Sequence, residues 1–251
     1  MKRILIILSG LLLFATSQAQ IGRFPFAKTI ATSGSSGLTE GLVGYWKLDE
    51  TSGDAIDAYG SHDGTVTGSI QGVEGKIDNC YQLAGTATNG VQIGASTDFN
   101  LASKGSISVW FVTSVAAWSR GWIIGTMESY ATAGYGIYLD SGGTPVFTTS
   151  IGSADAAIKY TVNMAASANW HHCVMTWDVD GNLITYLDNT QVDSREITIT
   201  PTDSGDNLTI GINTNTFNEW VFNGKIDEVL IYNRVLTSDE VSDLYDLTQP
   251  L

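Results

Sequence analysis

Short stretches of alternating hydrophobic and polar residues run along most of the chain, which is the pattern of half-buried β-strands. Ile107, Val109 and Phe111 are apolar, for example, whereas Ser106 and Ser108 between them face away. Turn residues separate these stretches at even intervals. The stretches that we interpret as strands are residues 42–48, 106–113, 121–126, 135–139, 171–178, 183–187, 207–212 and 225–232.

One helix is predicted, close to the end of the chain. Thr237 and Glu240 have the spacing of a capping box, in which each side chain bonds a backbone amide near the start of the helix. Val241 and Leu244 then follow at helical spacing. We therefore expect a short amphipathic helix over residues 238–246 that packs on the strands.

Asp180-Gly181 lies between two predicted strands and is the signature of a type I′ hairpin. Many evenly spaced strands without alternating helices exclude a parallel α/β fold. The pattern predicts an all-β sandwich or jelly roll with a short C-terminal helix.

The start of the chain has the pattern of a secretion signal. Lys2 and Arg3 precede an apolar run at residues 4–14, and small residues then lead to Ala19. We predict a signal peptide over residues 1–19, which places the mature protein outside the cell, in the periplasm or on the cell surface. An uncleaved anchor is the alternative.

The domain organisation is simple. Residues 20–40 are predicted to be a flexible linker, because they end in the Gly- and Ser-rich stretch 33–37. No second linker interrupts residues 41–251, so we expect one domain there.

The chain is acidic, with 12 Lys and Arg against 26 Asp and Glu and a formal net charge of -14. Such a surface repels phosphate backbones and anionic membranes, so nucleic acid is excluded as a partner. No membrane span is expected after signal cleavage. Acidity suits divalent cations, but it also serves solubility alone.

The two cysteines, Cys80 and Cys173, both lie in apolar, strand-like runs. Export would permit a disulfide between them. We favour a pair of free thiols in the core.

Several segments of the chain match a known family in the expected order. They are residues 41–50 (GLVGYWKLDE), 57–64 (DAYGSHDG), 75–83 (GKIDNCYQL), 106–110 (SISVW), 170–178 (WHHCVMTWD) and 222–237 (FNGKIDEVLIYNRVLT). The chain resembles the bacterial laminin-G-like jelly rolls of the concanavalin-A-like lectin and glucanase group. The resemblance implies a two-sheet antiparallel jelly-roll sandwich with a concave face for ligands. Family members are mostly carbohydrate-binding, adhesive or structural modules, so function is narrowed only loosely.

Related glucanases need two Glu residues that bracket an Asp on one strand, so that both carboxylates share a face. The nearest candidate here is the segment from Lys225 to Asp227-Glu228, and Lys occupies the first carboxylate position. We therefore predict that the protein is not an enzyme. His171 and His172 are adjacent on a strand and face opposite ways, which disfavours a shared metal.

A calcium site is the sharper hypothesis for the loop at residues 57–64, which holds two carboxylates among Gly, Ser and Tyr. The resemblance adds that such jelly rolls often hold one structural calcium where this loop meets the closing strand. It implies Asp57, Asp63 and Asp227 as ligands. The alternative is that these carboxylates only bond turn and backbone amides.

Aromatic residues outside the family's strand positions are candidates for stacking on sugar rings, whose C–H faces are apolar. The alternative is that these rings cover the edges of the core. The candidates are Trp118, Trp122, Tyr130, Tyr135 and Trp220.

The sequence thus predicts an exported, non-catalytic carbohydrate-binding or adhesion module, with calcium as its one cofactor. Its expected partner is a glycan or cell-surface polysaccharide. The alternative is a structural component of a cell-surface appendage or phage virion that binds other protein subunits. A third reading is a glycan-active enzyme with an unfamiliar site.

Overall fold

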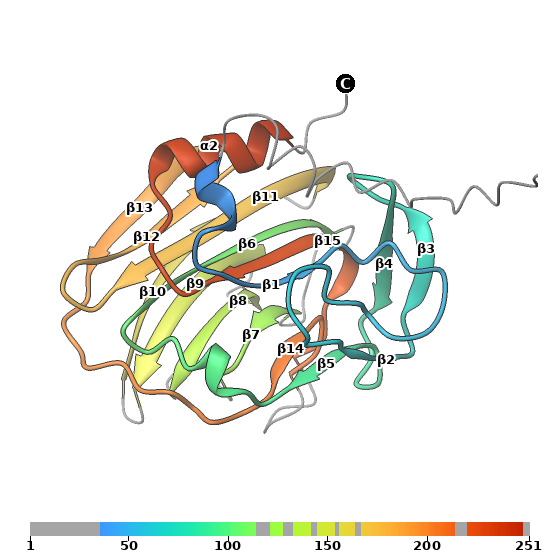
Figure 1. Cartoon of the computed structure of the whole chain (residues 1–251), viewed down its shortest axis with the longest axis horizontal. Coiled ribbons are helices and arrows are strands. Elements are labelled where there is room, and N and C mark those ends of the chain that lie inside the picture. The colour runs from blue at the N-terminus through green and yellow to red at the C-terminus, as the bar shows by residue number, and fades with distance from the viewer. Residues whose placement is uncertain are drawn as a thin grey trace, which may run out of the picture.

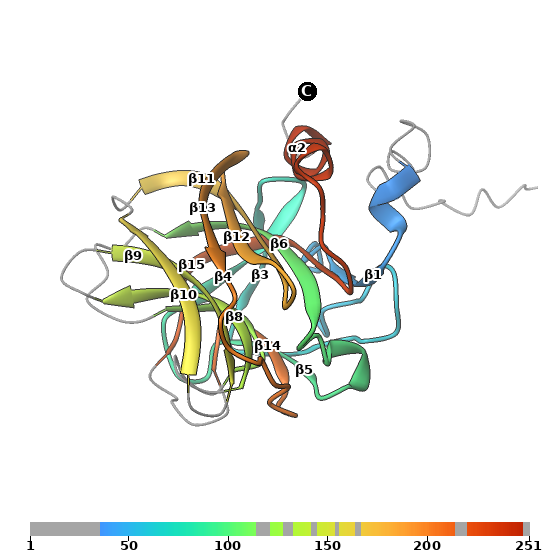
Figure 2. The ribbon, with the colours of Figure 1, turned by 90° about the vertical axis from the view of Figure 1, so that its left-hand side faces the viewer.

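Two antiparallel β-sheets stacked face to face form the body of the protein (Figures 1 and 2). The computed structural model describes residues 36–113, 121–127, 133–141, 145–153, 156–163, 167–213 and 220–247. The predicted all-β sandwich is confirmed, and each of the eight predicted strands overlaps an observed strand. The sequence pattern therefore predicted the fold class and the positions of these strands correctly.

The larger sheet has eight strands in the order β13-β12-β11-β6-β15-β4-β3, with β1 also paired to β15. Two strands share one side of β15, because β4 pairs with its first half and β1 with its second half. The strands are β1 (Leu42–Trp46), β3 (Ile70–Glu74), β4 (Asn79–Ala84), β6 (Lys104–Thr113), β11 (Ser167–Asp178), β12 (Asn182–Leu187), β13 (Thr190–Glu196) and β15 (Asn223–Tyr232).

The smaller sheet has seven strands in the order β10-β9-β8-β7-β14-β5-β2. A one-turn 3-10 helix, η2 (Thr97–Phe99), leads from this sheet to β6. The strands are β2 (Thr65–Thr67), β5 (Gly90–Gly94), β7 (Gly121–Gly125), β8 (Gly134–Ser141), β9 (Pro145–Ser153), β10 (Ala156–Asn163) and β14 (Leu208–Ile210).

Strand β6 shows how the two faces of the larger sheet differ. Ile107, Val109 and Phe111 point into the core between the sheets. Ser106 and Ser108 point the other way, as predicted, yet both are fully buried because a helix covers that face. Alternation thus indicates the side on which a residue lies, but not whether that side meets water.

The covering helix is α2 (Ser238–Leu247), which lies across the outer face of the larger sheet (Figure 1). Its predicted capping box is present: the Thr237 backbone N–H donates to the Glu240 carboxylate at 2.8 Å, and the Glu240 N–H donates to the Thr237 hydroxyl at 3.3 Å. Val241 and Leu244 are the residues that it buries.

The domain begins earlier than the predicted linker boundary at residue 40. A 3-10 helix, η1 (Ser36–Thr39), packs beside α2, and Leu38 within it is fully buried. Arg234 ties the two helices together by donating to the Gly37 carbonyl at 2.6 Å and to both Glu240 carboxylate oxygens. Polar composition hid this docking, because a single Leu provides the contact.

The turn between β11 and β12 corrects another detail. The Gly181 N–H donates to the Asp178 carbonyl at 2.9 Å, but neither Asp180 nor Gly181 has a positive φ, so the turn is not type I′. The two-residue turn with positive φ at both positions is Asp188-Asn189, between β12 and β13. The Asp188 carboxylate is held there from β11, because it accepts the His172 N–H at 2.9 Å and lies 2.8 Å from the His171 Nδ1.

Cys80 and Cys173 are free and buried, in agreement with the favoured interpretation. Within the described residues, no helix has both the length and the apolar character required to cross a membrane.

Candidate functional site

The loop at residues 57–64, singled out for its carboxylates, folds around one of them. The buried Asp57 carboxylate accepts backbone N–H groups from Tyr45, Tyr59, Gly60 and His62, at 2.9–3.1 Å. Burial alone would raise the pKa of Asp57, but these four donors hold it below its usual value. The loop is therefore built on an ionised, buried Asp.

Gly60 permits this close wrapping. A Cβ atom at this position would lie 2.5 Å from the Asp57 carboxylate and 3.0 Å from the Val43 carbonyl oxygen. Any other residue would push the loop away from its central carboxylate. The loop backbone thus has a fixed position relative to β1.

His62 connects this loop to η2. Its Nε2 lies 3.1 Å from the Asp98 carboxylate, and its Nδ1 lies 3.4 Å from that of Asp57. The imidazole ring also packs against Phe99, with 4.8 Å between ring centroids. Asp98 itself is mostly exposed, with 60% of its side-chain surface open to solvent. His62 therefore joins a buried carboxylate to an exposed one.

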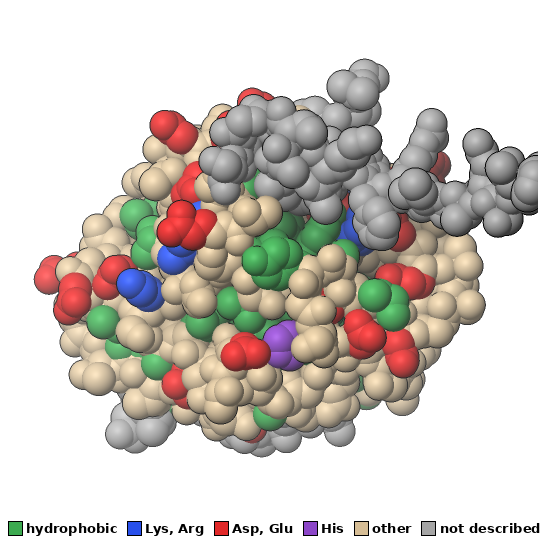
Figure 3. All heavy atoms as spheres, in the orientation of Figure 1, with side chains coloured by type: hydrophobic (Ala, Val, Ile, Leu, Met, Phe, Trp, Pro, Cys, Tyr) green, Lys and Arg blue, Asp and Glu red, His purple; other side chains and the backbone are tan. Residues whose placement is uncertain are grey.

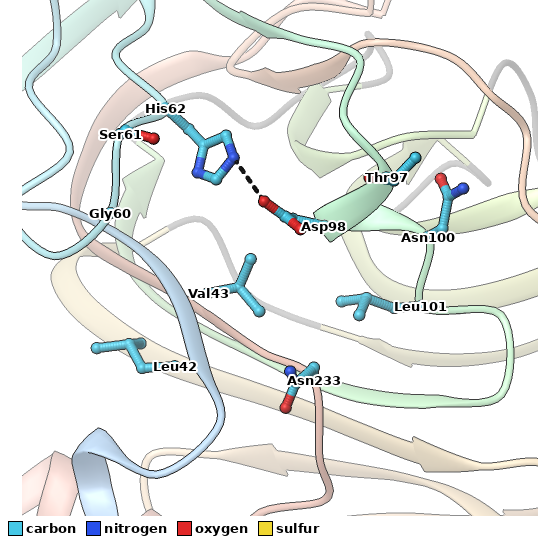
Figure 4. Close-up of a pocket in the computed structure, with 10 residues that line it drawn as sticks. All are labelled: Leu42, Val43, Gly60, Ser61, His62, Thr97, Asp98, Asn100, Leu101 and Asn233. Carbon is cyan, nitrogen blue, oxygen red and sulfur yellow. Dashed lines mark hydrogen bonds and ion pairs between the residues drawn. The ribbon is translucent and has the colours of Figure 1, made fainter.

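A pocket of about 510 Å³ opens beside this pair (Figure 4). Val43 and Leu101 point toward its middle, and Asn233 lies on the side opposite His62 and Asp98 (Figure 4). Four segments that are far apart in sequence build it. Its lining residues are Leu42, Val43, Gly60, Ser61, His62, Thr97, Asp98, Asn100, Leu101 and Asn233.

A second pocket of about 590 Å³ continues from the first and shares Asn100, Leu101 and Asn233 with it. Its remaining lining residues are Glu40, Gly41, Ser103, Lys104 and Arg234. We call the two pockets together the groove. Most of its lining side chains donate or accept hydrogen bonds, and the His62 imidazole is the one aromatic ring among them, so it is suited to hydroxyl-rich ligands.

The predicted calcium ligands do not form one site. Asp57 is occupied by backbone donors, Asp63 accepts the Asp57 N–H at 2.8 Å, and Asp227 accepts the N–H groups of Lys76 and Ile77. Across the described residues, no three His, Cys, Asp or Glu side chains are grouped to hold a metal ion. The structure therefore does not bring the three ligands implied by the resemblance together, and a calcium site stays a prediction. The turn-bonding alternative describes these residues correctly.

Three of the five aromatic residues predicted to stack on sugars lie in the described part of the chain, and all three are buried. Trp122 and Trp220 are buried together on the outer face of the smaller sheet, with ring centroids 6.2 Å apart. Tyr135 is buried in the core between the sheets and donates to the Phe99 carbonyl at 3.1 Å. None of the three offers an open ring face to a sugar. Trp118 and Tyr130 lie outside the described residues.

The carboxylate pair that most resembles a glycosidase motif, Asp227 and Glu228, is fully buried. Burial raises the pKa of Glu228 to about 8. Two carboxylates that a sugar cannot reach cannot bracket a glycosidic bond.

Sequence reasoning missed the exposed polar residues of the groove, above all Asn100 and Asn233. Asn233 stands in the closing segment that carries the family resemblance, directly after β15. Asn100 follows η2, whose N-cap Ser96 and Asp98 form a short capping signal. Those local signals were present, but nothing in the sequence indicated that the two Asn residues line the same groove.

Comparisons with known proteins agree with the fold. Among solved structures, the binding domain of Paraclostridial Mosquitocidal Protein 1 matches with a TM-score of 0.68 and 17% identity, over 83% of this chain and 52% of that one. A botulinum neurotoxin type C structure, titled for cell entry through two ganglioside molecules, matches with a TM-score of 0.66 and 13% identity, over 86% and 53%. The binding domain of botulinum neurotoxin DC in complex with SialylT matches with a TM-score of 0.65 and 16% identity, over 84% and 52%.

The chain thus spans about half the length of each of these structures. No curated protein matches it by sequence. The family model described as the concanavalin A-like lectin/glucanases superfamily matches residues 84–242, which is more than half of the chain. The chain therefore belongs to the concanavalin A-like lectin/glucanase superfamily.

Proposed function

We propose that this protein is an exported, non-catalytic carbohydrate-binding or adhesion module that holds a glycan in the groove. The observation that carries the proposal is the groove itself. It presents exposed carboxylate, amide and hydroxyl side chains from separate segments, on a base that buried hydrogen bonds hold in place. Groups of this kind match the hydroxyls of a sugar as both donors and acceptors.

The protein's structural neighbours support a binding role. Several of the solved structures that match are described as binding or receptor-binding domains, one is described by its interaction with two ganglioside molecules, and one is in complex with SialylT. Another neighbour is titled in complex with rat synaptotagmin II, a protein partner. We favour a glycan because the groove is lined mainly by polar side chains, whereas protein interfaces are centred on aromatic and apolar anchors.

The absence of catalysis is part of the proposal. The groove borders two exposed or partly exposed carboxylates, Asp98 and Glu40, which lie in different pockets. Asp227 and Glu228 are closed off in the core. Binding without turnover predicts that no reducing ends are released from any polysaccharide that the protein binds.

Export rests on residues 1–19, which the structure does not describe, and on the acidic surface. Figure 3 shows acidic side chains at several places around one face, with hydrophobic side chains exposed between them. Expression in a bacterial host with intact-mass analysis tests this part. A mature chain that begins at Gln20 and is found outside the cytoplasm is the expected result.

A glycan array is the first test of binding, with the hits then titrated by calorimetry. Asn233→Ala removes an exposed amide shared by both pockets and is expected to weaken binding at least tenfold. Gln82→Ala, which removes an exposed amide on β4 opposite Lys225, at the end of β15 away from Asn233, is the matched control and should bind as the wild type does. Titration of EDTA-stripped protein with calcium, followed by calorimetry and by melting temperature, tests the predicted calcium ligands separately.

Two results would count against the proposal. Equal affinity of the Asn233→Ala variant and the wild type would move binding away from the groove. Silence across neutral and acidic glycans, together with oligomers in light scattering, would favour a structural role through other protein subunits.

A further inference from the structure

We infer that the groove holds several consecutive units of one neutral glycan chain, which runs through both pockets. This inference rests on the proposed function and specifies its ligand. Each pocket alone has a volume within the range of about 300–1,000 Å³ that small-ligand sites occupy. Because the pockets are continuous, the whole groove is longer than one sugar ring requires.

The junction between the pockets is polar and open. Asn100 and Asn233 are exposed there, and neither side chain has a hydrogen-bond partner among the described residues. An amide side chain donates and accepts at once, so it can bond two neighbouring hydroxyls of a sugar. Leu101 beside them is buried and closes the floor.

Gly41 keeps this junction clear. Its φ is +68°, and a Cβ atom would lie 2.8 Å from the Asn233 side-chain oxygen and 3.0 Å from the Arg234 Cγ. The Asn233 N–H donates to the Gly41 carbonyl at 2.8 Å, which fixes the approach of the two segments. A side chain at this position would press into Asn233, where the two pockets meet.

The charges along the groove favour a neutral ligand. Asp98 lines the first pocket and Glu40 lines the second. Arg234 is neutralised by its paired bonds to Glu240. Lys104 is then the one lining cation without an ion pair in the described part of the chain, and the protein as a whole carries a net charge of -14. A uronic-acid chain would be repelled here.

Chain length provides the first test. Gluco-, xylo-, manno- and galacto-oligosaccharides of two and six units are titrated by calorimetry against the wild-type protein. For the series that binds, we expect the six-unit ligand to bind at least tenfold more tightly than the two-unit ligand. Equal affinities would overturn the inference while leaving the proposed function in place. Failure of every saccharide to bind would overturn both.

Two conservative variants at opposite ends of the groove test whether one chain spans it. Thr97→Ala removes a hydroxyl from the first pocket and Ser103→Ala removes one from the second. Both should weaken the six-unit ligand at least threefold, and at most one should weaken the two-unit ligand. Unchanged melting temperatures establish that both variants fold. Loss of long-chain affinity in only one of them would overturn the inference.

Hexagalacturonate, an acidic chain of matched length, tests the charge argument. It should bind at least tenfold more weakly than the neutral six-unit ligand. Asp98→Asn, which removes one groove carboxylate, should reduce the difference in affinity between the acidic and the neutral ligand. Equal or tighter binding of the acidic chain to the wild-type protein would contradict a neutral ligand.

Discussion

Two buried carboxylates, Asp57 and Glu228, both bond to Tyr45, but they differ in how many hydrogen-bond donors they receive. Asp57 accepts the Tyr45 backbone N–H at 3.0 Å, together with three further backbone donors. Glu228 accepts the Tyr45 hydroxyl at 2.5 Å, and its other oxygen is buried with no hydrogen-bond partner among the described residues. Both groups lose solvation by burial, so the number of donors decides their charge.

The difference also separates their roles. Asp57 is ionised and organises the loop that lines the groove. Glu228 lies at a bulge in β15, with a positive φ of +51°, at the point where the partner of that strand changes from β4 to β1. A buried acid with too few donors retains its proton and becomes a source of pH-dependent stability. A buried carboxylate thus organises the groove loop at Asp57 and makes the stability of the fold depend on pH at Glu228.

Removing the Asp57 carboxylate should have the largest effect on stability. Asp57→Ala leaves four backbone N–H groups without their acceptor, and we expect the free energy of unfolding to fall by about 4 kcal/mol. Urea denaturation measures this. Asp63→Ala, which removes one acceptor from an exposed side chain, should cost about 1 kcal/mol. Similar losses in both variants would show that Asp57 does not organise the loop.

Raising the pH should have the next largest effect on the free energy of unfolding. The pKa of Glu228 is raised by burial to about 8, so its stabilisation is full below its unfolded pKa of about 4.3 and is lost as the pH rises through about 8. We expect the free energy of unfolding to fall by on the order of 3 kcal/mol between about pH 5 and pH 8. The contribution of Asp57 to stability has the opposite pH dependence, because its pKa is lowered in the folded protein. This stabilisation is present above the usual pKa of an Asp and is lost as the pH falls below it.

Glu228→Gln tests the source of this alkaline loss. The neutral amide matches the protonated acid in shape, so the variant should lose the part of the pH dependence that Glu228 causes and be more stable than the wild type above about pH 8. Burial also raises the pKa of the neighbouring Asp227, so that group retains an alkaline loss of its own. Glu74→Gln, on the exposed edge strand β3, should keep the wild-type profile. A Glu228→Gln profile that follows the wild type would assign the alkaline loss to another group.

Tyr45→Phe gives a smaller and more selective effect. The variant retains the backbone N–H to Asp57 and loses only the hydroxyl to Glu228, so we expect a loss of about 2 kcal/mol in unfolding free energy. Glycan affinity should not change. Tyr232→Phe is the control, because the Tyr232 hydroxyl is buried without a hydrogen-bond partner among the described residues. A fall in the glycan affinity of Tyr45→Phe, alongside its loss of stability, would show that Asp57 and Glu228 act together.

The sequence predicted local features well. Alternation placed Ile107 and Val109 in the core, and the Thr237 and Glu240 capping box marked the start of α2. These features depend on neighbours within a few residues, where strand and helix periodicity act directly. The type I′ turn was predicted at the wrong hairpin, because the general Asp-Gly preference does not decide between turns of different length.

The candidate site was predicted poorly for a physical reason. The 57–64 loop was found from its carboxylates, but the choice between calcium and backbone amides depends on how Asp57 is surrounded. The sequence left Trp122 and Trp220 as either sugar-stacking rings or rings that cover the core, and only the fold decides between the two, because it buries them side by side. Asn100 and Asn233 line the same two pockets only through the tertiary structure, and no local pattern reports such an arrangement.

The most direct test of the groove uses nuclear magnetic resonance. A ¹⁵N-labelled protein is titrated with the neutral oligosaccharide that binds most tightly in calorimetry. We predict that the side-chain amide signals of Asn100 and Asn233 shift, and that the indole N–H signals of Trp122 and Trp220 remain in place. Shifts of the two indoles with unchanged Asn signals would contradict a groove-bound glycan and place the ligand on the outer face of the smaller sheet.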